Sequence, residues 1–114
     1  MKKIEAIIRE TKFQDVKTKL TKLGIRGLTA YEVRGRGEQA GSLREGGNSE
    51  DYTSDDLVPK MKIEVVCIEE EVNKVTSSIV ANAFTGNPGD GKIFIFDVED
   101  VIKISTAGKP SNQV

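Results

Sequence analysis

The chain has 114 residues, which is enough for one compact domain with one hydrophobic core and too few for two ordinary domains. Its formal net charge of -1 gives no global positive field that would favour nucleic acid or anionic lipid as a partner. The absence of histidine excludes Ser-His, Cys-His and zinc-His chemistry within one chain, and the single cysteine, Cys67, excludes an internal disulfide. We expect a cytoplasmic location, because no apolar run approaches the roughly 20 residues that span a bilayer and the first residues do not resemble a signal peptide.

Residues 3–9 alternate between apolar and polar side chains, which is the pattern of a half-buried strand. A helix should follow, since Thr11 and Gln14 fit a capping box and Gly24 suits the left-handed position at a helix end. The apolar stripe of that helix consists of Phe13, Val16, Leu20 and Leu23. Residues 27–34 then have the composition of a second strand.

From Gly35 to about Val58 the periodicity stops, and glycines lie among charged and polar residues. A compact domain seldom contains a loop of this length unless the loop is functional or disordered. An idle solvated insertion is the alternative interpretation.

The second half repeats the pattern of the first. Residues 61–67 alternate as a third strand, and three glutamates then precede a second amphipathic helix. The buried stripe of this helix consists of Val72, Val75, Ile79 and Ala83. Residues 86–91, rich in glycine, form neither helix nor strand, whereas 93–98 are strongly β-forming and 101–105 are expected to add a short strand.

Two βαβ units in tandem predict an α+β fold of the ferredoxin-like class, with one antiparallel sheet covered by two helices. The helices cover only one face of such a sheet. Apolar residues on both faces of the third and fourth strands therefore indicate that an oligomer buries the second face.

Four segments carry a resemblance to a known family. Residues 1–8 (Met-Lys-Lys-Ile-Glu-Ala-Ile-Ile), 32–37 (Glu-Val-Arg-Gly-Arg-Gly) and 57–64 (Leu-Val-Pro-Lys-Met-Lys-Ile-Glu) are similar to strands of the PII nitrogen-regulatory signalling family. The most specific segment is 85–94, which reads Thr-x-x-x-Gly-Asp-Gly-Lys-Ile-Phe and matches the C-terminal signature of that family. The chain resembles the family along nearly its whole length.

The resemblance implies a single domain over residues 1–114, with a T-loop at 36–58, a B-loop at 84–91 and a C-terminal loop at 103–114. It also implies a homotrimer that binds ATP or ADP in the clefts between subunits. Many members bind 2-oxoglutarate with magnesium as well, and they control transporters or enzymes through the T-loop.

The segment Gly89, Asp90, Gly91 and Lys92 is the best candidate for a phosphate site. Glycines let backbone amides approach an anion closely, and the lysine supplies a positive charge. No serine or threonine follows the lysine, so this is not a Walker A loop. A tight turn with a surface lysine is the alternative.

The resemblance assigns further ligand contacts. Gly35, Arg36 and Gly37 would bring the T-loop backbone to the same phosphates, and Glu64 would accept a hydrogen bond from a ribose hydroxyl. The positions that match the adenine site are Gly27, Leu28, Thr29 and Val66. A solvated or salt-bridged strand glutamate is the alternative for Glu64, and β-propensity is the alternative for Thr29.

Several positions depart from the family pattern. Lys103 and Ser105 stand where the family usually has two arginines, and Glu38 replaces a third. Lysine lacks the bidentate fork of arginine and serine lacks the charge, so we expect a weaker preference for the triphosphate, with ADP or AMP as the main ligand.

The oxoacid site departs as well. Gln39 and Lys60 match residues that the family uses around magnesium and 2-oxoglutarate, but Glu38 and Ala40 flank Gln39 where the family usually has Arg and Lys. A dicarboxylate needs positive surroundings, so we expect these two changes to weaken 2-oxoglutarate binding. Tyr52, the tyrosine of the loop, lacks the sequence context of the family's nucleotidylated tyrosine.

The resulting prediction is a non-enzymatic regulator that senses adenine nucleotides and acts through the T-loop on a protein target such as a membrane transporter or an enzyme. A full nitrogen sensor that binds Mg-ATP and 2-oxoglutarate is the main alternative. A trimeric metal-binding protein of related fold and a slow nucleotide hydrolase are weaker alternatives, because the chain has no histidine and no paired carboxylates at a defined spacing.

Overall fold

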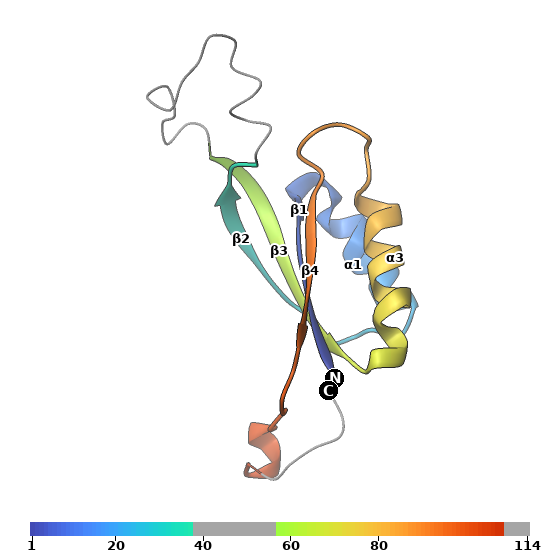
Figure 1. Ribbon diagram of the computed structural model, residues 1–114, viewed down its shortest axis with the longest axis vertical. Helices are drawn as coiled ribbons and strands as arrows, with labels where there is room; N and C mark the ends of the chain where they lie inside the picture. The colour runs from blue at the N-terminus through green and yellow to red at the C-terminus, as the bar shows by residue number, and fades with distance from the viewer. Residues whose placement is uncertain (38–56, 109–114) are drawn as a thin grey trace.

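The computed structural model describes residues 1–37 and 57–108, in which a four-stranded sheet is covered on one face by two helices (Figure 1). The elements in chain order are β1 (Lys2–Arg9), α1 (Phe13–Lys22), β2 (Thr29–Gly35), β3 (Val58–Cys67), α3 (Val72–Ala83) and β4 (Gly91–Asp97). Short 3-10 turns lie at Glu10–Lys12, Glu69–Glu71 and Ile104–Thr106. The predicted ferredoxin-like α+β fold is confirmed.

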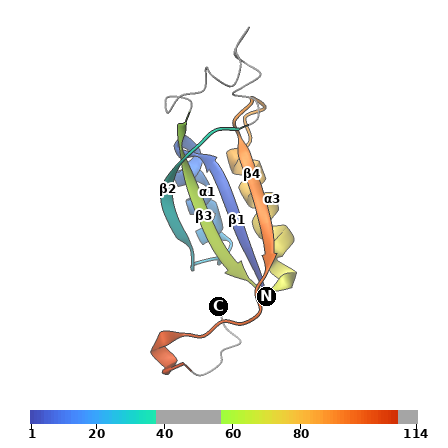
Figure 2. The same cartoon turned by 60° about the vertical axis from the view of Figure 1, so that its left-hand side comes forward.

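The strands pair in the order β2-β3-β1-β4, and every pairing is antiparallel. Figure 2 shows the four strands side by side in this order, with both helices behind them. The register pairs Ile4 with Val65 and Glu5 with Glu64. Because successive residues of a strand point to opposite faces, the first pair faces the helices and the second faces away from them. We call the face away from the helices the open face.

The core lies between the sheet and the helices. Its buried residues are Ile4, Ala6, Ile8, Val16, Leu20, Ile25, Ile63, Val65, Cys67, Val75, Ile79 and Ala83. Both predicted helical stripes are therefore confirmed at their centres, while Phe13, Leu23 and Val72 are partly buried against the same core. Burial of an aliphatic side chain of this size stabilises a fold by roughly 1.5–3 kcal/mol. Burial also raises the pKa of the Cys67 thiol, which is a core group rather than a reactive one.

The beginning of α1 differs from the prediction. Thr11 lies inside the 3-10 turn Glu10–Lys12, and neither Arg9 nor Lys12 makes a side-chain capping bond, so the predicted capping box is wrong. The amide of Phe13 instead donates to the carbonyl of Glu10, which lets the chain leave the strand and enter the helix in three residues.

The end of α1 agrees with the prediction. Gly24 has φ +89°, its amide donates to Thr21 at 3.0 Å, and the amide of Ile25 donates to Leu20 at 2.9 Å. These bonds satisfy carbonyls at the helix end in the manner expected of a glycine in the left-handed region.

The predicted short strand over residues 101–105 is wrong. Ile102 makes an isolated bridge, and the 3-10 turn Ile104–Thr106 follows it. The side chains of Ile102 and Ile104 are 58% and 95% exposed, so β-propensity alone does not build a strand where the described chain offers no surface to pack on.

The open face combines charge with aromatic surface. Glu5 forms ion pairs with Lys3 at 2.9 Å and Lys62 at 3.1 Å, and these hydrogen bonds lower the pKa of its carboxyl group. Phe94 and Phe96 on β4 are both exposed on this face. The sheet thus keeps one dry side against the helices and one mixed side that a single chain leaves uncovered.

Candidate functional site

The turn between α3 and β4 is organised by one carboxylate. Asp90 accepts hydrogen bonds from the Thr85 hydroxyl at 2.6 Å, the Thr85 amide at 2.9 Å and the Gly86 amide at 3.1 Å. These bonds, first of all the one from the Thr85 hydroxyl, hold the pKa of Asp90 well below its usual range. We therefore expect Asp90 to serve a ligand by fixing the backbone of the turn, because its own oxygens are engaged within the chain.

Two cations fasten this turn to the sheet. Arg9, at the end of β1, donates through Nε to Asp90 at 3.1 Å and through Nη2 to the Pro88 carbonyl at 2.7 Å. Lys60 on β3 donates through Nζ to the Gly89 carbonyl. Burial, followed by the charge of Arg9, lowers the pKa of Lys60.

Arg9 and Lys60 lie directly opposite each other in the β1–β3 register. Like charges at such a pair repel, so the site accommodates them only because Asp90 and two carbonyls lie beside them. An additional anion would stabilise this arrangement further. We call Arg9 and Lys60 the cation pair.

Two glycines allow the turn to approach the sheet. Gly91 has φ +103°, and a Cβ atom at this position would lie 1.7 Å from the carbonyl oxygen of Ile7. Gly89 has φ +100°, and its added Cβ would lie 3.3 Å from Nη2 of Arg9. No residue with a side chain fits at position 91 without separating β1 from β4.

Gly35 and Gly27 have no such internal reason to be glycine. Neither has a φ in the left-handed region, and an added Cβ would meet no atom of the described residues within 4 Å. Space that the described residues leave open beside a backbone is what close approach of a ligand or of another subunit requires.

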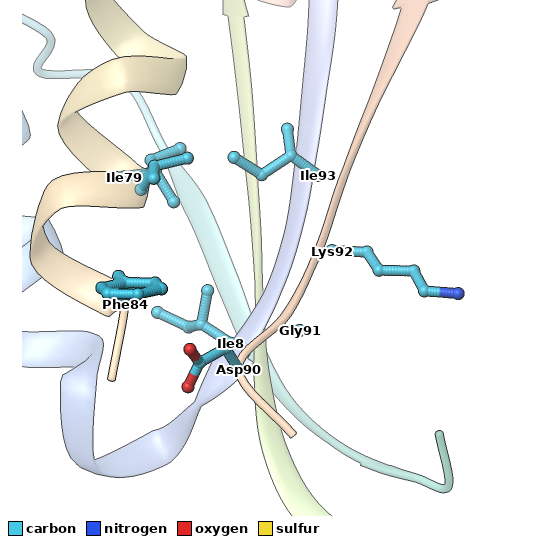
Figure 3. Close-up of a pocket in the computed structure, with 9 residues that line it drawn as sticks. Ile8, Ile79, Phe84, Asp90, Gly91, Lys92 and Ile93 are labelled. Carbon is cyan, nitrogen blue, oxygen red and sulfur yellow. The ribbon is translucent and has the colours of Figure 1, made fainter. Parts of the chain in front are cut away.

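Lys92 lies on the open face, since its register partner on β1 is Ile7. Behind it, between α3 and β4, lies a cavity of about 300 Å³ lined chiefly by apolar side chains such as Ile8, Ile79 and Phe84. Asp90, Gly91 and Lys92 also belong to its lining, but Figure 3 shows the Lys92 side chain directed away from the apolar side chains. The Lys92 ammonium group, which is the predicted phosphate contact, therefore does not point into this apolar cavity.

A second polar group lies lower on the open face. Thr29 on β2 lies opposite Glu64 on β3, and the Tyr31 hydroxyl donates to Oε2 of Glu64 at 2.8 Å. Lys62 lies over the ring of Tyr31, with Nζ 5.6 Å from the ring centroid. Glu64 is thus held by a neighbouring side chain and is not merely solvated.

The predicted ligand residues fall into separate groups within one chain. Gly35, Arg36, Gly37, Lys60 and residues 89–92 lie at one end of the sheet, at the top of Figure 1, where β2 ends and β3 and β4 begin. Those toward the other end are Gly27, Leu28, Thr29, Glu64 and Val66. Lys103 and Ser105 lie next to or in the last 3-10 turn, at the bottom of Figure 1 and far from Lys92. Glu38, Gln39, Ala40 and Tyr52 lie outside the described residues.

Sequence reasoning did not identify Arg9 or Tyr31 as site residues. Arg9 contacts a residue 81 positions later in the chain, so no local pattern reports that contact. A usable signal was the strand pairing, which predicts that the charges of Arg9 and Lys60 oppose each other.

Among residues 1–37 and 57–108, no group of three or more acidic or cysteine side chains is placed to hold a metal ion. Within the same ranges, no helix is both long enough and apolar enough to cross a membrane.

The chain is similar to one protein family over nearly all of its length. A family model described as nitrogen regulatory protein P-II matches residues 1–108. The chain is 47% identical over 106 residues to nitrogen regulatory protein P-II 1 of Methanothermobacter thermautotrophicus, covering 93% of this chain and 90% of that protein. It is 49% identical over 106 residues to nitrogen regulatory protein P-II of Porphyra purpurea, covering 93% of each chain. It is also 47% identical over 114 residues to one from Nostoc punctiforme, covering 100% of each.

Proposed function

We propose, from the premise that this chain belongs to the nitrogen regulatory protein P-II family, that it reports nitrogen status by binding an adenine nucleotide together with 2-oxoglutarate. As a member of that family it is a signalling protein and not an enzyme. The observation that carries the proposal is the Asp90-organised turn with the cation pair beside it.

The phosphates are assigned to the turn at residues 89–92. Asp90 and Gly91 fix its backbone, and Lys92 contributes a mobile positive charge on the open face. The ribose and adenine are assigned to the group around Glu64 and Thr29, with Gly27, Leu28 and Val66 beside them. These residues fit a nucleotide because they combine hydrogen-bond acceptors, an open glycine backbone and apolar strand ends.

The separation of these groups supports the homotrimer that the family assignment implies. Lys103 and Ser105 lie at the opposite end of the chain from Lys92, so one chain cannot bring them to the same phosphates. The exposure of Ile104, Phe94 and Phe96 leaves apolar surface that further copies would bury. We infer that each nucleotide lies in a cleft between two subunits.

The oxoacid is assigned to the cation pair. A carboxylate matches the fork of Arg9, and its negative charge would favour the charged form of Lys60, whose pKa is lowered first by burial and then by the charge of Arg9. Gln39, outside the described residues, would supply an oxygen ligand to magnesium, and the bound ion would supply positive charge between the phosphates and the oxoacid.

The family assignment favours this nitrogen-sensing function over the adenylate sensor that Glu38, Lys103 and Ser105 suggested. Because of these three departures, the affinity for ADP should be measured as well as the affinity for ATP. We further propose that the bound ligands control how residues 36–58 interact with a protein target. A membrane transporter is the first class of target to test.

Calorimetric titration of the purified protein tests the proposal. ATP, ADP and AMP are titrated with and without magnesium, and then with 2-oxoglutarate. We expect Lys92→Ala to abolish nucleotide binding. Lys60→Met should abolish only the effect of 2-oxoglutarate and leave nucleotide binding intact. Lys22→Ala on α1, the control, should change neither. Nucleotide binding that is indifferent to 2-oxoglutarate would instead support adenylate sensing.

A further inference from the structure

The hydrogen bond between Tyr31 and Glu64 joins two residues of adjacent strands on the open face. The Tyr31 hydroxyl donates to Oε2 at 2.8 Å, and the register places Thr29, two residues before Tyr31 on β2, directly opposite Glu64. Two hydroxyl groups therefore flank one carboxylate. Oε1 of Glu64 is the oxygen that this bond leaves available to a further donor.

Tyr31 is itself held in place. Lys62 lies over its ring at 5.6 Å, and the ammonium group of Lys62 forms an ion pair with Glu5 at 3.1 Å. That ion pair directs Lys62 toward Glu5 and leaves Glu64 to the tyrosine. A continuous set of side-chain contacts therefore crosses three strands, running from Glu5 through Lys62 and Tyr31 to Glu64.

We propose that Tyr31 is a positioning residue that makes the site selective for ribonucleotides over deoxyribonucleotides. It holds the carboxylate of Glu64 so that Oε1 accepts a hydrogen bond from a ribose hydroxyl. This inference rests on the proposed nucleotide function and adds to it the sugar specificity of the site. Fixing a flexible glutamate before the ligand arrives removes part of the ordering cost of binding, which is the physical reason for a tyrosine here.

The test compares ADP, 2′-deoxy-ADP and 3′-deoxy-ADP on wild-type protein and on Tyr31→Phe. The phenylalanine variant keeps the ring and its cation–π contact with Lys62, and it loses the hydroxyl, which interacts with both Glu64 and Lys62. We expect ADP affinity to fall by about two- to tenfold, the range that one hydrogen bond commands. Affinity for the deoxy analogue that wild-type protein discriminates against should stay nearly unchanged, so the ratio of ribo to deoxy affinity falls.

A double-mutant cycle separates positioning from a general structural effect. In the Glu64→Gln background, Tyr31→Phe should have no further effect on the ratio, because the carboxylate on which it acts is gone. Thr21→Val removes a hydroxyl that donates to the Lys17 carbonyl at 2.9 Å on α1 and should leave the ratio unchanged.

An unchanged ratio in Tyr31→Phe, or a wild-type protein that discriminates against neither deoxy analogue, would overturn the inference. Failure of the wild-type protein to bind any adenine nucleotide would overturn both this inference and the proposed function. Binding of ADP with the expected ratio but without any response to 2-oxoglutarate would contradict the nitrogen-sensing proposal and leave the role of Tyr31 supported.

Discussion

Gly91 is the position where the structure most strictly requires a glycine. It begins β4 opposite Ile8 on β1, with φ +103°. In Gly91→Ala, the new methyl group would have to lie 1.7 Å from the carbonyl oxygen of Ile7 and 3.3 Å from Cα of Ile8. The first of these atoms belongs to the backbone of a central strand, so no side-chain rotation relieves the contact.

The cost has two parts. An alanine held in the left-handed region loses about 1–2 kcal/mol relative to glycine. Moving the end of β4 away from β1 breaks one or two ladder hydrogen bonds, each worth roughly 1 kcal/mol. The expected loss is therefore about 3 kcal/mol of unfolding free energy, a large share of the roughly 5–15 kcal/mol that holds a typical domain together.

Two glycines of the same chain provide matched controls. Gly24→Ala meets no atom within 4 Å but keeps φ +89°, so it should lose only the conformational part, about 1–2 kcal/mol. Gly35→Ala has neither constraint and should be neutral or slightly stabilising in unfolding, because alanine restricts the unfolded chain. Gly35→Ala should nevertheless weaken nucleotide binding if the ligand approaches that backbone.

Urea denaturation at one fixed protein concentration measures these differences, since oligomer stability depends on concentration. The expected order of destabilisation is Gly91→Ala, then Gly24→Ala, then Gly35→Ala. The reasoning fails if Gly91→Ala loses no more stability than Gly24→Ala, because the close approach to Ile7 would then have no energetic consequence.

Three further predictions use other parts of the structure. Lys60 has a pKa below its ordinary 10.5, so it loses its charge at a lower pH than an ordinary lysine; 2-oxoglutarate affinity should therefore fall as the pH rises toward 10.5, and it should fall less in Lys60→Arg, whose guanidinium stays charged. Asp90 has a pKa depressed below 3.8, so its stabilising contribution is present above that value and is lost as the pH falls through the folded-state pKa. In acid titrations followed by circular dichroism, the stability of Asp90→Asn should therefore depend less on pH in this acidic range than that of the wild-type protein. Ile79→Ala should lose about 2–4 kcal/mol in denaturant unfolding, and the exposed neighbouring Val80→Ala under about 0.5 kcal/mol.

The parts of the fold that follow from periodic burial were predictable from the sequence. Val75, Ile79 and Ala83 repeat at helical spacing because one core holds them all. Ile4, Ala6 and Ile8 repeat at the two-residue spacing of a strand for the same reason. The failures lie where no shared core imposes a period. A three-residue turn replaces the capping box before α1, and residues 101–105 lack a packing surface within the described chain.

The candidate site divides in the same way. Residues 85–94 were recognisable because consecutive residues build the turn, with Asp90 bonded to residues four and five positions earlier. Arg9 and Tyr31 were not, since their contacts cross strands and span 81 and 33 positions. A sequence pattern places such side chains on a face of the sheet, but only the register decides which side chain meets which.

The cation pair offers a physical basis for the proposed signalling. Lys60 donates to the turn that would hold the phosphates, yet it lies two residues after Val58, where β3 begins and the segment 36–58 ends. An anion that draws Lys60 and Arg9 away from Pro88 and Gly89 would therefore change the turn and the start of β3 together. A ligand shifts such an equilibrium only by its differential affinity for the two arrangements. Lys60→Met removes the lysine from both arrangements. It should therefore uncouple 2-oxoglutarate from nucleotide binding, while the nucleotide still binds through Lys92.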